Sequence, residues 1–597
     1  MVEANFQVLS PGEGLTLIQN RYGKHNTFKS TEEFNAASRS VKPGVSAAGI
    51  VSSWTHASTL LTSCTLSYSY GAVGTFQTLF FAVAAFKIKE KSDSAYTFPE
   101  IVLRGHGKIA HIIYTFFGLV TNLINGSALA AGGCAVFSSL TGMNIGAAYW
   151  ILPTIVTAYI VVGGLRATFI CDYLHAIFLY VCIFAFMFQI YSINPSIGSS
   201  SALWHLLKEK SGSAATDSYN GSYMTIDSND GLVTAATIFL GGFPAVWTDQ
   251  AYWQRAIASQ PGIAVKGYIL GSFAWYAVPF AMPTTLGLAA AALTGTAGIP
   301  VKLSAKQVSA GLVGPAAATA LVGKVSAGLM VVLLFMATTS STSAESIAAS
   351  SLVTFDIYKA YINPRASIKS LFWVSVFGLV IYGALLAAIS CVFHSVGISL
   401  NWLIKIQGSF IGGGAIPMAC ALLWDRTSTF AVIVSPVIGL VRGLTSWMIA
   451  TKMRSGTVNI TTTSNTWSLL TGDCVSLGMG AVSIIVFSLL VPNKKKLAVV
   501  EGLEEPNALP SAPEKKGPGD QETAPDTEKH AGGRVIEENA DAEELKPIKG
   551  EEYIAELALS PTEAKSQKRL ALISLILGSL IFMISFLMAL TEIDAVR

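Results

Sequence analysis

Long apolar stretches separated by short polar segments make up most of the chain. A helix needs about 20 apolar residues to cross the hydrocarbon of a bilayer, and about thirteen stretches reach or approach that length. They are 46–71, 72–88, 109–137, 143–163, 166–192, 231–257, 263–293, 323–357, 367–391, 400–423, 428–450, 471–491 and 569–590. The pattern predicts an all-α integral membrane protein.

The composition agrees with this prediction. Hydrophobic residues make up 52% of the chain and charged residues only 13%, whereas a soluble domain carries about 25% charged residues. The net charge of +3 is small, and no basic stripe is interleaved with aromatic residues, which argues against nucleic-acid binding. The cysteines lie in apolar segments without a CxxC pair, which argues against a disulfide framework or a zinc site.

The chain divides into four parts. Residues 1–45 contain no apolar span, and 46–491 form the transmembrane core. Residues 492–568 are rich in Glu, Asp, Pro and Lys and predict a disordered cytoplasmic linker. Residues 569–597 hold the last apolar helix and a short tail.

Basic residues predict the orientation, because cytoplasmic loops carry an excess of Lys and Arg. Arg21, Lys24 and Lys29 place the N-terminus in the cytoplasm, and the loop 89–108 follows on the same side. An odd number of crossings then places the C-terminus outside. We expect a multi-pass protein of the plasma membrane.

The span 323–357 is unusual because residues 337–351 are dense in small hydroxyl side chains. In lipid such groups bond to backbone carbonyls or face a partner or an ion. Clustered hydroxyl oxygens suit a hard cation such as sodium. The alternative is that the hydroxyls only bond back to the preceding turn.

Two other spans carry features that disfavour a continuous helix. Residues 51–71 are rich in Ser and Thr, which predicts a buried helix, continuous or unwound, that lines a cavity. In 231–257, Gly241, Gly242 and Pro244 predict a break. Asp249 and Gln250 follow inside the same span, and intramembrane carboxylates usually face a cavity or a partner. Pairing of Asp249 with Arg255 is the alternative.

These two spans are the first and the sixth. Inverted repeats place discontinuous helices five apart, with the binding site between their halves. The pattern therefore predicts two five-helix repeats, with the eighth span packed against the first and a cation between them. Asp172, close to Arg166, either draws a cation inward or pairs with that arginine. Gln407 offers hydrogen bonds to a polar substrate, and Glu345 shares a helix face with Ser341.

Four strings of residues carry a family resemblance. They are Glu33-Phe-Asn-Ala-Ala-Ser-Arg-Ser-Val-Lys-Pro-Gly44, Gly163-Gly-Leu-Arg-Ala-Thr168, Asp249-Gln-Ala-Tyr-Trp-Gln-Arg-Ala-Ile-Ala-Ser259 and Ser350-Ser-Leu-Val-Thr-Phe-Asp-Ile-Tyr358. With them the chain resembles the fungal urea/polyamine active transporters of the sodium:solute symporter family. The resemblance implies the LeuT-type inverted-repeat fold with extra helices. It also implies cation-coupled uptake of urea, and of polyamines as further substrates, by alternating access.

The resemblance also implies site residues. Cation-binding residues fall on Ala337, Ser340 and Ser341 of the eighth span, with first-span carbonyls near Ser52 and Thr55. From its position in the fifth span, and not from the resemblance, Asp172 is expected to assist cation release. The substrate pocket is expected to contain Trp54, Ser58, Thr59, Asp249, Gln250 and Gln407. The coupling ion is Na⁺ or H⁺, no cofactor is expected, and no covalent chemistry is implied. The expected partners are the solute and the lipid bilayer.

The chain differs from the family pattern in three places. No apolar helix precedes the first core span, 72–88 is short, and His56 replaces an aromatic residue. The first two differences raise an alternative function, a nutrient receptor or degenerate paralogue that binds urea or polyamine and transports little. His56 adds a group that titrates near neutral pH in its unperturbed state.

Overall fold

The computed structural model describes residues 31–71, 95–211, 218–225, 228–260, 264–295 and 303–492. Within them the chain is helical, with two isolated β-bridges, Val41 to Ser259 and Ser218 to Ser228. The predicted all-α class is confirmed. The span 72–88, the helix 569–590, residues 1–30 and the linker beyond 492 lie outside the described residues.

Nine helices of the described part are long and apolar enough to cross a membrane. They are α7 (Lys108–Thr141), α8 (Ile145–Phe188), α10 (Asn229–Thr248), α12 (Ala264–Met282), α16 (Lys324–Ser351), α17 (Ile368–Ser395), α18 (Leu400–Leu423), α19 (Thr429–Ser455) and α21 (Thr466–Leu490). Three of them continue into π-helical segments, which are η2 (Gln189–Ile193) after α8, η4 (Pro283–Gly287) after α12 and η5 (Leu352–Ile362) after α16.

Shorter helices connect or cover the long ones. They are α2 (Thr31–Ala36), η1 (Ala37–Arg39), α3 (Pro43–Trp54), α4 (Ala57–Tyr70), α6 (Phe98–His106), α9 (Ser200–Glu209), η3 (Tyr219–Gly221), α11 (Gln250–Ala258), α13 (Leu288–Leu293), α14 (Ala305–Ser309), α15 (Val313–Val322) and α20 (Ile460–Thr463). Two predicted spans, 143–163 and 166–192, lie together in α8. Gly164 separates them with a non-helical φ of 55°, a conformation that glycine adopts readily.

The first predicted span is broken. The α3 helix ends at Trp54, and α4 begins at Ala57. Thr55 (φ −89°, ψ 73°) and His56 (φ −68°, ψ 152°) leave the helical conformation between them. The predicted discontinuity of the first core helix is confirmed.

The sixth span is also broken, but at a different residue from the one predicted. Gly241, Gly242 and Pro244 all lie inside α10, and the chain leaves the helix at Asp249 (φ −91°, ψ 115°). There the carboxylate Oδ1 accepts a hydrogen bond of 2.8 Å from the Ala251 N–H at the start of α11. Side-chain capping by Asp249 favours a new helix start, whereas a membrane helix tolerates a proline because its surroundings satisfy the freed backbone.

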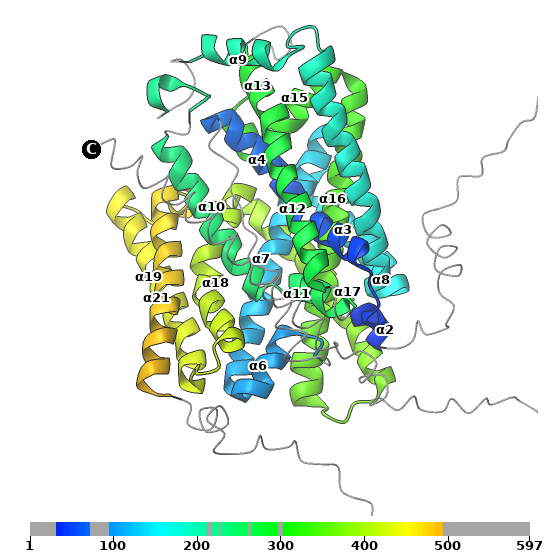
Figure 1. The fold of residues 1–597 in the computed structure, drawn as a ribbon, viewed down its shortest axis with the longest axis vertical. Helices are drawn as coiled ribbons and strands as arrows, with labels where there is room; N and C mark the ends of the chain where they lie inside the picture. The colour runs from blue at the N-terminus through cyan, green and yellow to red at the C-terminus, as the bar shows by residue number, and fades with distance from the viewer. Residues whose placement is uncertain are drawn as a thin grey trace, which may run out of the picture. The chain divides into compact units, whose positions relative to one another are not determined.

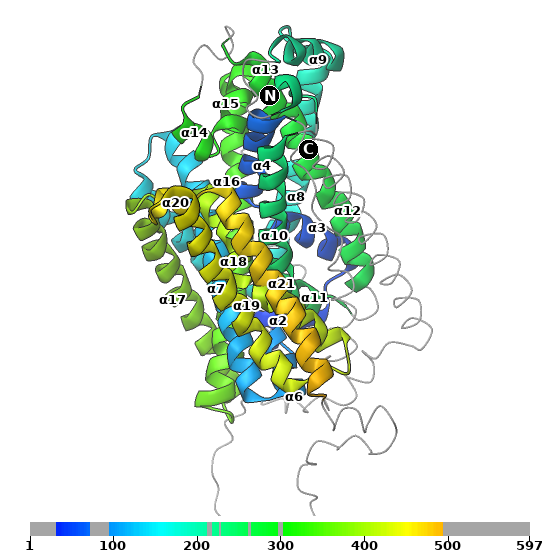
Figure 2. The same ribbon diagram turned by 90° about the vertical axis from the view of Figure 1, so that its left-hand side faces the viewer.

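The helices form two neighbouring sets in Figure 1, with α10, α18, α19 and α21 on the left and α3, α8, α12 and α16 on the right. The α7 helix contacts both sets through α16 and α18. The α16 helix also contacts α3, as expected for the eighth and first spans. Figure 2 turns the bundle so that α19 and α21 face the viewer, packed along each other.

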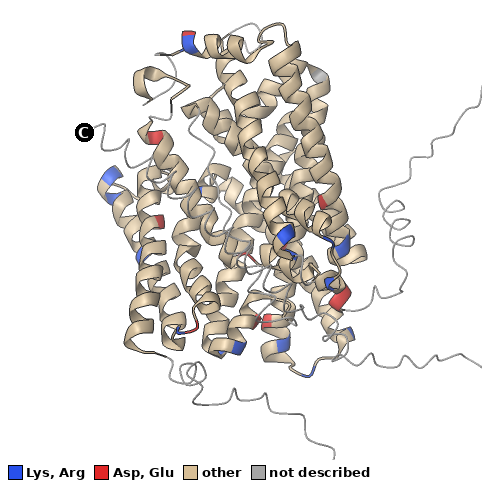
Figure 3. Ribbon diagram, in the orientation of Figure 1, with Lys and Arg blue, Asp and Glu red and all other residues tan. Residues whose placement is uncertain are grey.

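The outer faces of the long helices are apolar. Phe184, Phe377 and Leu489 are each at least 65% exposed, on α8, α17 and α21. Figure 3 shows few charged residues along the helices, and most lie towards one end of the bundle. Exposed apolar bands of this extent are typical of surfaces that face lipid.

Glycines allow α18, α19 and α21 to approach one another closely. A Cβ atom on Gly439 of α19 would lie 2.5 Å from the Cα of Gly413 on α18 and 2.7 Å from the carbonyl oxygen of Ser476 on α21. Both neighbours are backbone atoms and cannot rotate away. Close packing through small residues is a main source of helix association in membranes.

We therefore expect Gly439→Ala to destabilise the protein, because the added methyl group has no space. Overpacking of this kind costs about 1–3 kcal/mol, which thermal unfolding in detergent would detect as a lower melting temperature. Gly478→Ala on α21 is the matched control, since nothing lies within 4 Å of its added Cβ. Equal melting temperatures for the two variants would contradict this account of the packing.

Candidate functional site

Hydroxyl groups from α3 and α16 meet beside α8. The Oγ atoms of Ser52 and Ser340 lie 2.5 Å apart. Ser340 Oγ also donates to Asp172 Oδ1 at 2.5 Å, and Ser52 Oγ lies 2.7 Å from His175 Nδ1. The structure thus brings together two of the residues predicted to bind a cation and the residue predicted to assist its release.

Two further hydroxyls in this region are buried without a partner. Thr55 Oγ1, at the end of α3, and Ser341 Oγ accept and donate no hydrogen bond among the described residues. Ala337, also predicted as a ligand, is fully buried on the same turn of α16 as Ser341. Buried polar atoms normally have partners, and unpaired oxygens near a helix end fit a small hard cation as cargo.

Asp172 is held by an arginine from the broken sixth helix. Arg255 of α11 donates through a terminal nitrogen to Asp172 Oδ2 at 2.8 Å, and both side chains are at most 1% exposed. The guanidinium also lies over the ring of Phe169, 4.8 Å from its centre. Pairing of Asp172 with Arg166 was an open alternative. It is not observed, because Arg166 pairs with Glu33 at 2.5 Å.

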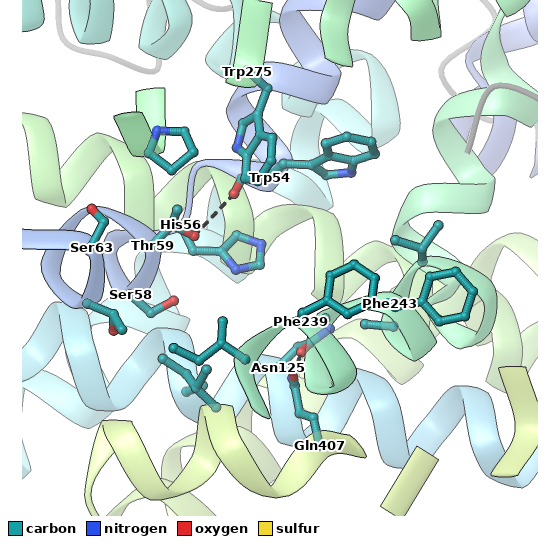
Figure 4. A pocket seen from close by; sticks show the side chains of 18 of the residues that line it. Trp54, His56, Ser58, Thr59, Ser63, Asn125, Phe239, Phe243, Trp275 and Gln407 are labelled. Atoms are coloured by element: carbon teal, nitrogen blue, oxygen red, sulfur yellow. Dashed lines mark hydrogen bonds between the residues drawn. The ribbon is translucent and has the colours of Figure 1, made fainter. Parts of the chain in front are cut away.

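A cavity of about 160 Å³ lies next to the break between α3 and α4. Four residues predicted for the substrate pocket line it, namely Trp54, Ser58, Thr59 and Gln407. Figure 4 shows these side chains around the space, with Asn125 beside Gln407 and the two phenylalanines Phe239 and Phe243 nearby. Amide, hydroxyl and aromatic side chains therefore surround a small volume.

The aromatic wall is built around Trp54. Its ring packs edge-on against Trp275 at 5.5 Å and against Tyr252 at 5.6 Å. Thr59 Oγ1 donates to the Trp54 carbonyl at 3.3 Å across the break, the dashed line in Figure 4. His56, in the unwound segment, also lines the cavity.

Gln250 was predicted to contact substrate but does not line the cavity. Its Nε2 donates to the Tyr96 carbonyl at 2.9 Å, and its Oε1 accepts from the Phe98 N–H at 3.1 Å. Both ends of the amide thus hold the segment that leads into α6. The side chain is occupied in positioning the backbone.

Asp249 also lies outside the lining residues, directly behind them. Asn125 donates to Asp249 Oδ2 at 2.7 Å and accepts a hydrogen bond from Gln407 Nε2 through its own Oδ1. The carboxylate therefore reaches the cavity wall through Asn125. Pairing with Arg255, the alternative for this residue, is not observed, because that arginine binds Asp172.

Sequence reasoning missed the role of Asn122 and Asn125 on α7. A visible signal was their spacing, because two asparagines three residues apart share one face of a membrane helix. Trp275 and Tyr252 carried no such signal, since aromatic residues in apolar spans occur at many positions.

A larger hollow of about 800 Å³ adjoins the cavity and shares Thr62 and Leu66 with it. Its lining includes Lys405 of α18 and the pair Glu209–Lys210 at the end of α9. Lys405 is 5% exposed and donates to Thr466 Oγ1 at 2.9 Å. The two hollows therefore border each other.

Comparison of the sequence with known proteins identifies its family. The family model described as "Sodium:solute symporter family" matches residues 34–439, which is more than half of the chain. The chain belongs to the sodium:solute symporter family. It is therefore a membrane transporter rather than an enzyme.

Similar curated proteins agree. The symporter is 39% identical over 484 residues to "Probable urea active transporter 1" of Schizosaccharomyces pombe, covering 79% of this chain and 73% of that protein. It is 37% identical over 504 residues to "Urea-proton symporter DUR3" of Oryza sativa subsp. japonica, covering 80% and 68%.

A solved structure shows the same fold. A Na⁺-coupled sialic acid symporter in a substrate-bound outward-open state aligns with a TM-score of 0.60 at 12% identity, covering 81% of this chain and 96% of that one. The LeuT-type architecture of the symporter is thus confirmed, although the predicted total of thirteen spans is not.

The buried pair of Asp172 and Arg255 gives a stability prediction for this symporter. Arg255→Gln should lower the melting temperature strongly, because breaking a buried pair leaves an uncompensated charge at a cost of about 3–5 kcal/mol. The double variant Asp172→Asn with Arg255→Gln should recover most of the loss, since no charge remains unpaired.

Thermal unfolding of the purified variants in detergent measures both effects. Arg454→Gln is the control, because Arg454 is exposed at the end of α19. A double variant as unstable as the single one would show that the charge pair is not the origin of the loss.

Proposed function

We propose that this symporter takes up urea across the plasma membrane, coupled to a cation, by alternating access. The observation that carries the proposal is the cavity at the broken helices, about 160 Å³ in volume and lined by amides, hydroxyls and aromatic rings. A cavity of roughly 150 Å³ accommodates benzene, so urea fits and a much larger solute does not. Names of relatives that include urea support the same substrate.

Urea needs hydrogen-bond donors for its carbonyl oxygen and acceptors for its two amino groups. Asn125 and Gln407 offer both through their amides, and Ser58 and Thr59 offer hydroxyls. The rings of Trp54 and Trp275 close the pocket over the flat faces of the solute. Asp249 acts behind this wall through Asn125, and Gln250 positions the segment before α6.

The cation site in this proposal consists of Ser52, Thr55, Ala337, Ser340 and Ser341, with Asp172 on the inward side. Binding there joins the end of α3 to α16 and so favours one arrangement of the two repeats. The sodium:solute family description supports Na⁺, and the name of the rice relative supports H⁺.

Polyamines fit this pathway less well than urea. The larger hollow, which we take as the entrance, is lined by Lys405 and Lys210 as well as Glu209. Among the described residues that line the inner cavity there is no Asp or Glu, so a polycation would pass a lysine and meet no carboxylate from them. We therefore assign the neutral solute as substrate.

Radiolabelled urea uptake in a yeast strain without its own urea transporters tests the function. Wild type should accumulate urea against its gradient, and Ser341→Ala should reduce accumulation about tenfold or more, which corresponds to losing roughly 1.4 kcal/mol of cation binding. Ser346→Ala is the control on the same helix, because its hydroxyl only bonds back to the Thr342 carbonyl at 2.7 Å.

Replacing sodium by choline at two pH values identifies the coupling ion. Loss of uptake in choline indicates Na⁺, and uptake that follows external acidity without sodium indicates H⁺. Binding of urea by wild type without accumulation would overturn the transport proposal and favour a nutrient receptor.

Competition by spermidine tests the assignment of a neutral substrate. Spermidine should leave urea uptake by wild type unchanged, and Lys405→Gln should make uptake sensitive to it, because a buried positive charge at the entrance is removed. Lys452→Gln on α19 is the control, since that lysine is exposed away from both cavities. Equal inhibition of all three proteins would show that Lys405 does not select against cations.

A further inference from the structure

Two carboxyl groups lie close together behind the substrate cavity. Asp249 stands at the break between α10 and α11, and Glu345 lies on α16, with exposures of 0% and 1%. Both also contact one nitrogen, since Asn122 Nδ2 donates to Asp249 Oδ1 at 3.3 Å and to Glu345 Oε2.

One amide nitrogen donates to both carboxyl groups, so their oxygens lie within a few hydrogen-bond lengths of each other. Two buried negative charges this close repel each other strongly in a medium that solvates neither. The burial and proximity of the pair therefore favour at least one bound proton.

No positive side chain in the described part of the chain forms an ion pair with Asp249 or Glu345. Arg255, whose charge acts on Asp249, is bound to Asp172. The other titratable groups that face the pair are the phenols of Tyr252 on α11 and Tyr382 on α17. The α7 and α18 helices contribute only amides, from Asn122, Asn125 and Gln407.

A second feature of the site indicates a place for a proton donor. Asn122 directs its amide into the pair, and its Oδ1 is buried with no hydrogen-bond partner. A buried acceptor without a donor is costly. The hydroxyl of a protonated carboxyl in the pair is a suitable donor for it, since the same amide already contacts both side chains.

A chain of hydrogen bonds also connects the pair to the cavity wall. Gln407 Nε2, which lines the cavity, donates to Asn125 Oδ1, and Asn125 Nδ2 donates to Asp249 Oδ2 at 2.7 Å. A solute that engages the Gln407 amide alters the chain of hydrogen bonds that ends on Asp249. Solute binding and proton binding would then influence each other reciprocally.

We propose that the Asp249–Glu345 pair carries the coupling proton of this symporter, an assignment that rests on the proposed function as a urea transporter. The proton enters from the outer side while the cavity is open there, and it leaves to the inner side after the helices rearrange.

The test uses the full chain in proteoliposomes with two measurements. Counterflow of labelled urea at equal pH reports transport without net coupling. Accumulation driven by an inward pH gradient reports coupling, and one pH unit sustains about a tenfold urea gradient for one proton per urea. Wild type should show both activities.

Glu345→Gln should keep counterflow and lose accumulation, because its amide satisfies Asp249 but carries no transferable proton. Counterflow of this variant should also become independent of pH. Asp473→Asn is the matched control, a buried carboxyl on α21 that accepts from Ser409 Oγ at 2.6 Å away from the pair. It should retain both activities.

The outcomes separate the two proposals. Absence of counterflow in wild type overturns the proposed function itself. Counterflow in wild type without accumulation under a pH gradient, or accumulation retained by Glu345→Gln, overturns the proton assignment and leaves urea transport standing.

If Glu345→Gln does not fold, Asp249→Asn takes its place, since asparagine preserves the cap of α11. Infrared difference spectra of wild type on addition of urea should then show a change in a protonated carboxyl band that is absent in that variant. An unchanged band in wild type also overturns the assignment.

Discussion

The structure depends on one constraint. Two segments of non-helical backbone lie in the interior of a membrane protein. Lipid satisfies no backbone group, so non-helical segments persist there only when protein or a cavity surrounds them. Thr55–His56 and Asp249 are both such segments, and both are buried or line the cavity. The helices α7, α8 and α16 are packed around them for this reason, and their polar side chains face inward.

The hydroxyl side chains of helix α16 have two different roles. Ser343, Ser346 and Thr338 donate to carbonyls of the preceding turn, as the simpler interpretation of the sequence expects. Ser340 instead reaches across to Ser52 and Asp172. Composition indicates that such a helix is buried, but only the facing partner decides which hydroxyls are available to an ion.

Local signals predicted much of the fold, and long-range contacts account for what they missed. The span 400–423 coincides with α18, and the break in the first helix follows from its density of Ser and Thr. The second break was predicted at Gly241, Gly242 and Pro244 because these residue types disfavour a helix. The break lies instead at Asp249, whose carboxylate caps the next helix. The partners of Asp172, Asp249 and Gln250 could not be predicted, since each lies more than 80 residues away in the chain.

The distribution of charge in the core gives a physical reason for coupling between sites that do not touch. Three carboxyl groups, Asp172, Asp249 and Glu345, are buried in the core, and the guanidinium of Arg255 forms an ion pair with Asp172. The guanidinium compensates Asp172, so the other two must be compensated by something that the protein does not supply from its described residues. Asp249 and Arg255 are in the same broken sixth helix. A movement of this helix therefore changes the surroundings of Asp172, which lies beside Ser52 and Ser340. It also changes the surroundings of the Asp249–Glu345 pair behind the cavity. Under the proposals made above, a cation that binds at either place biases one arrangement of that helix, and the solute, held against the same wall, responds to it.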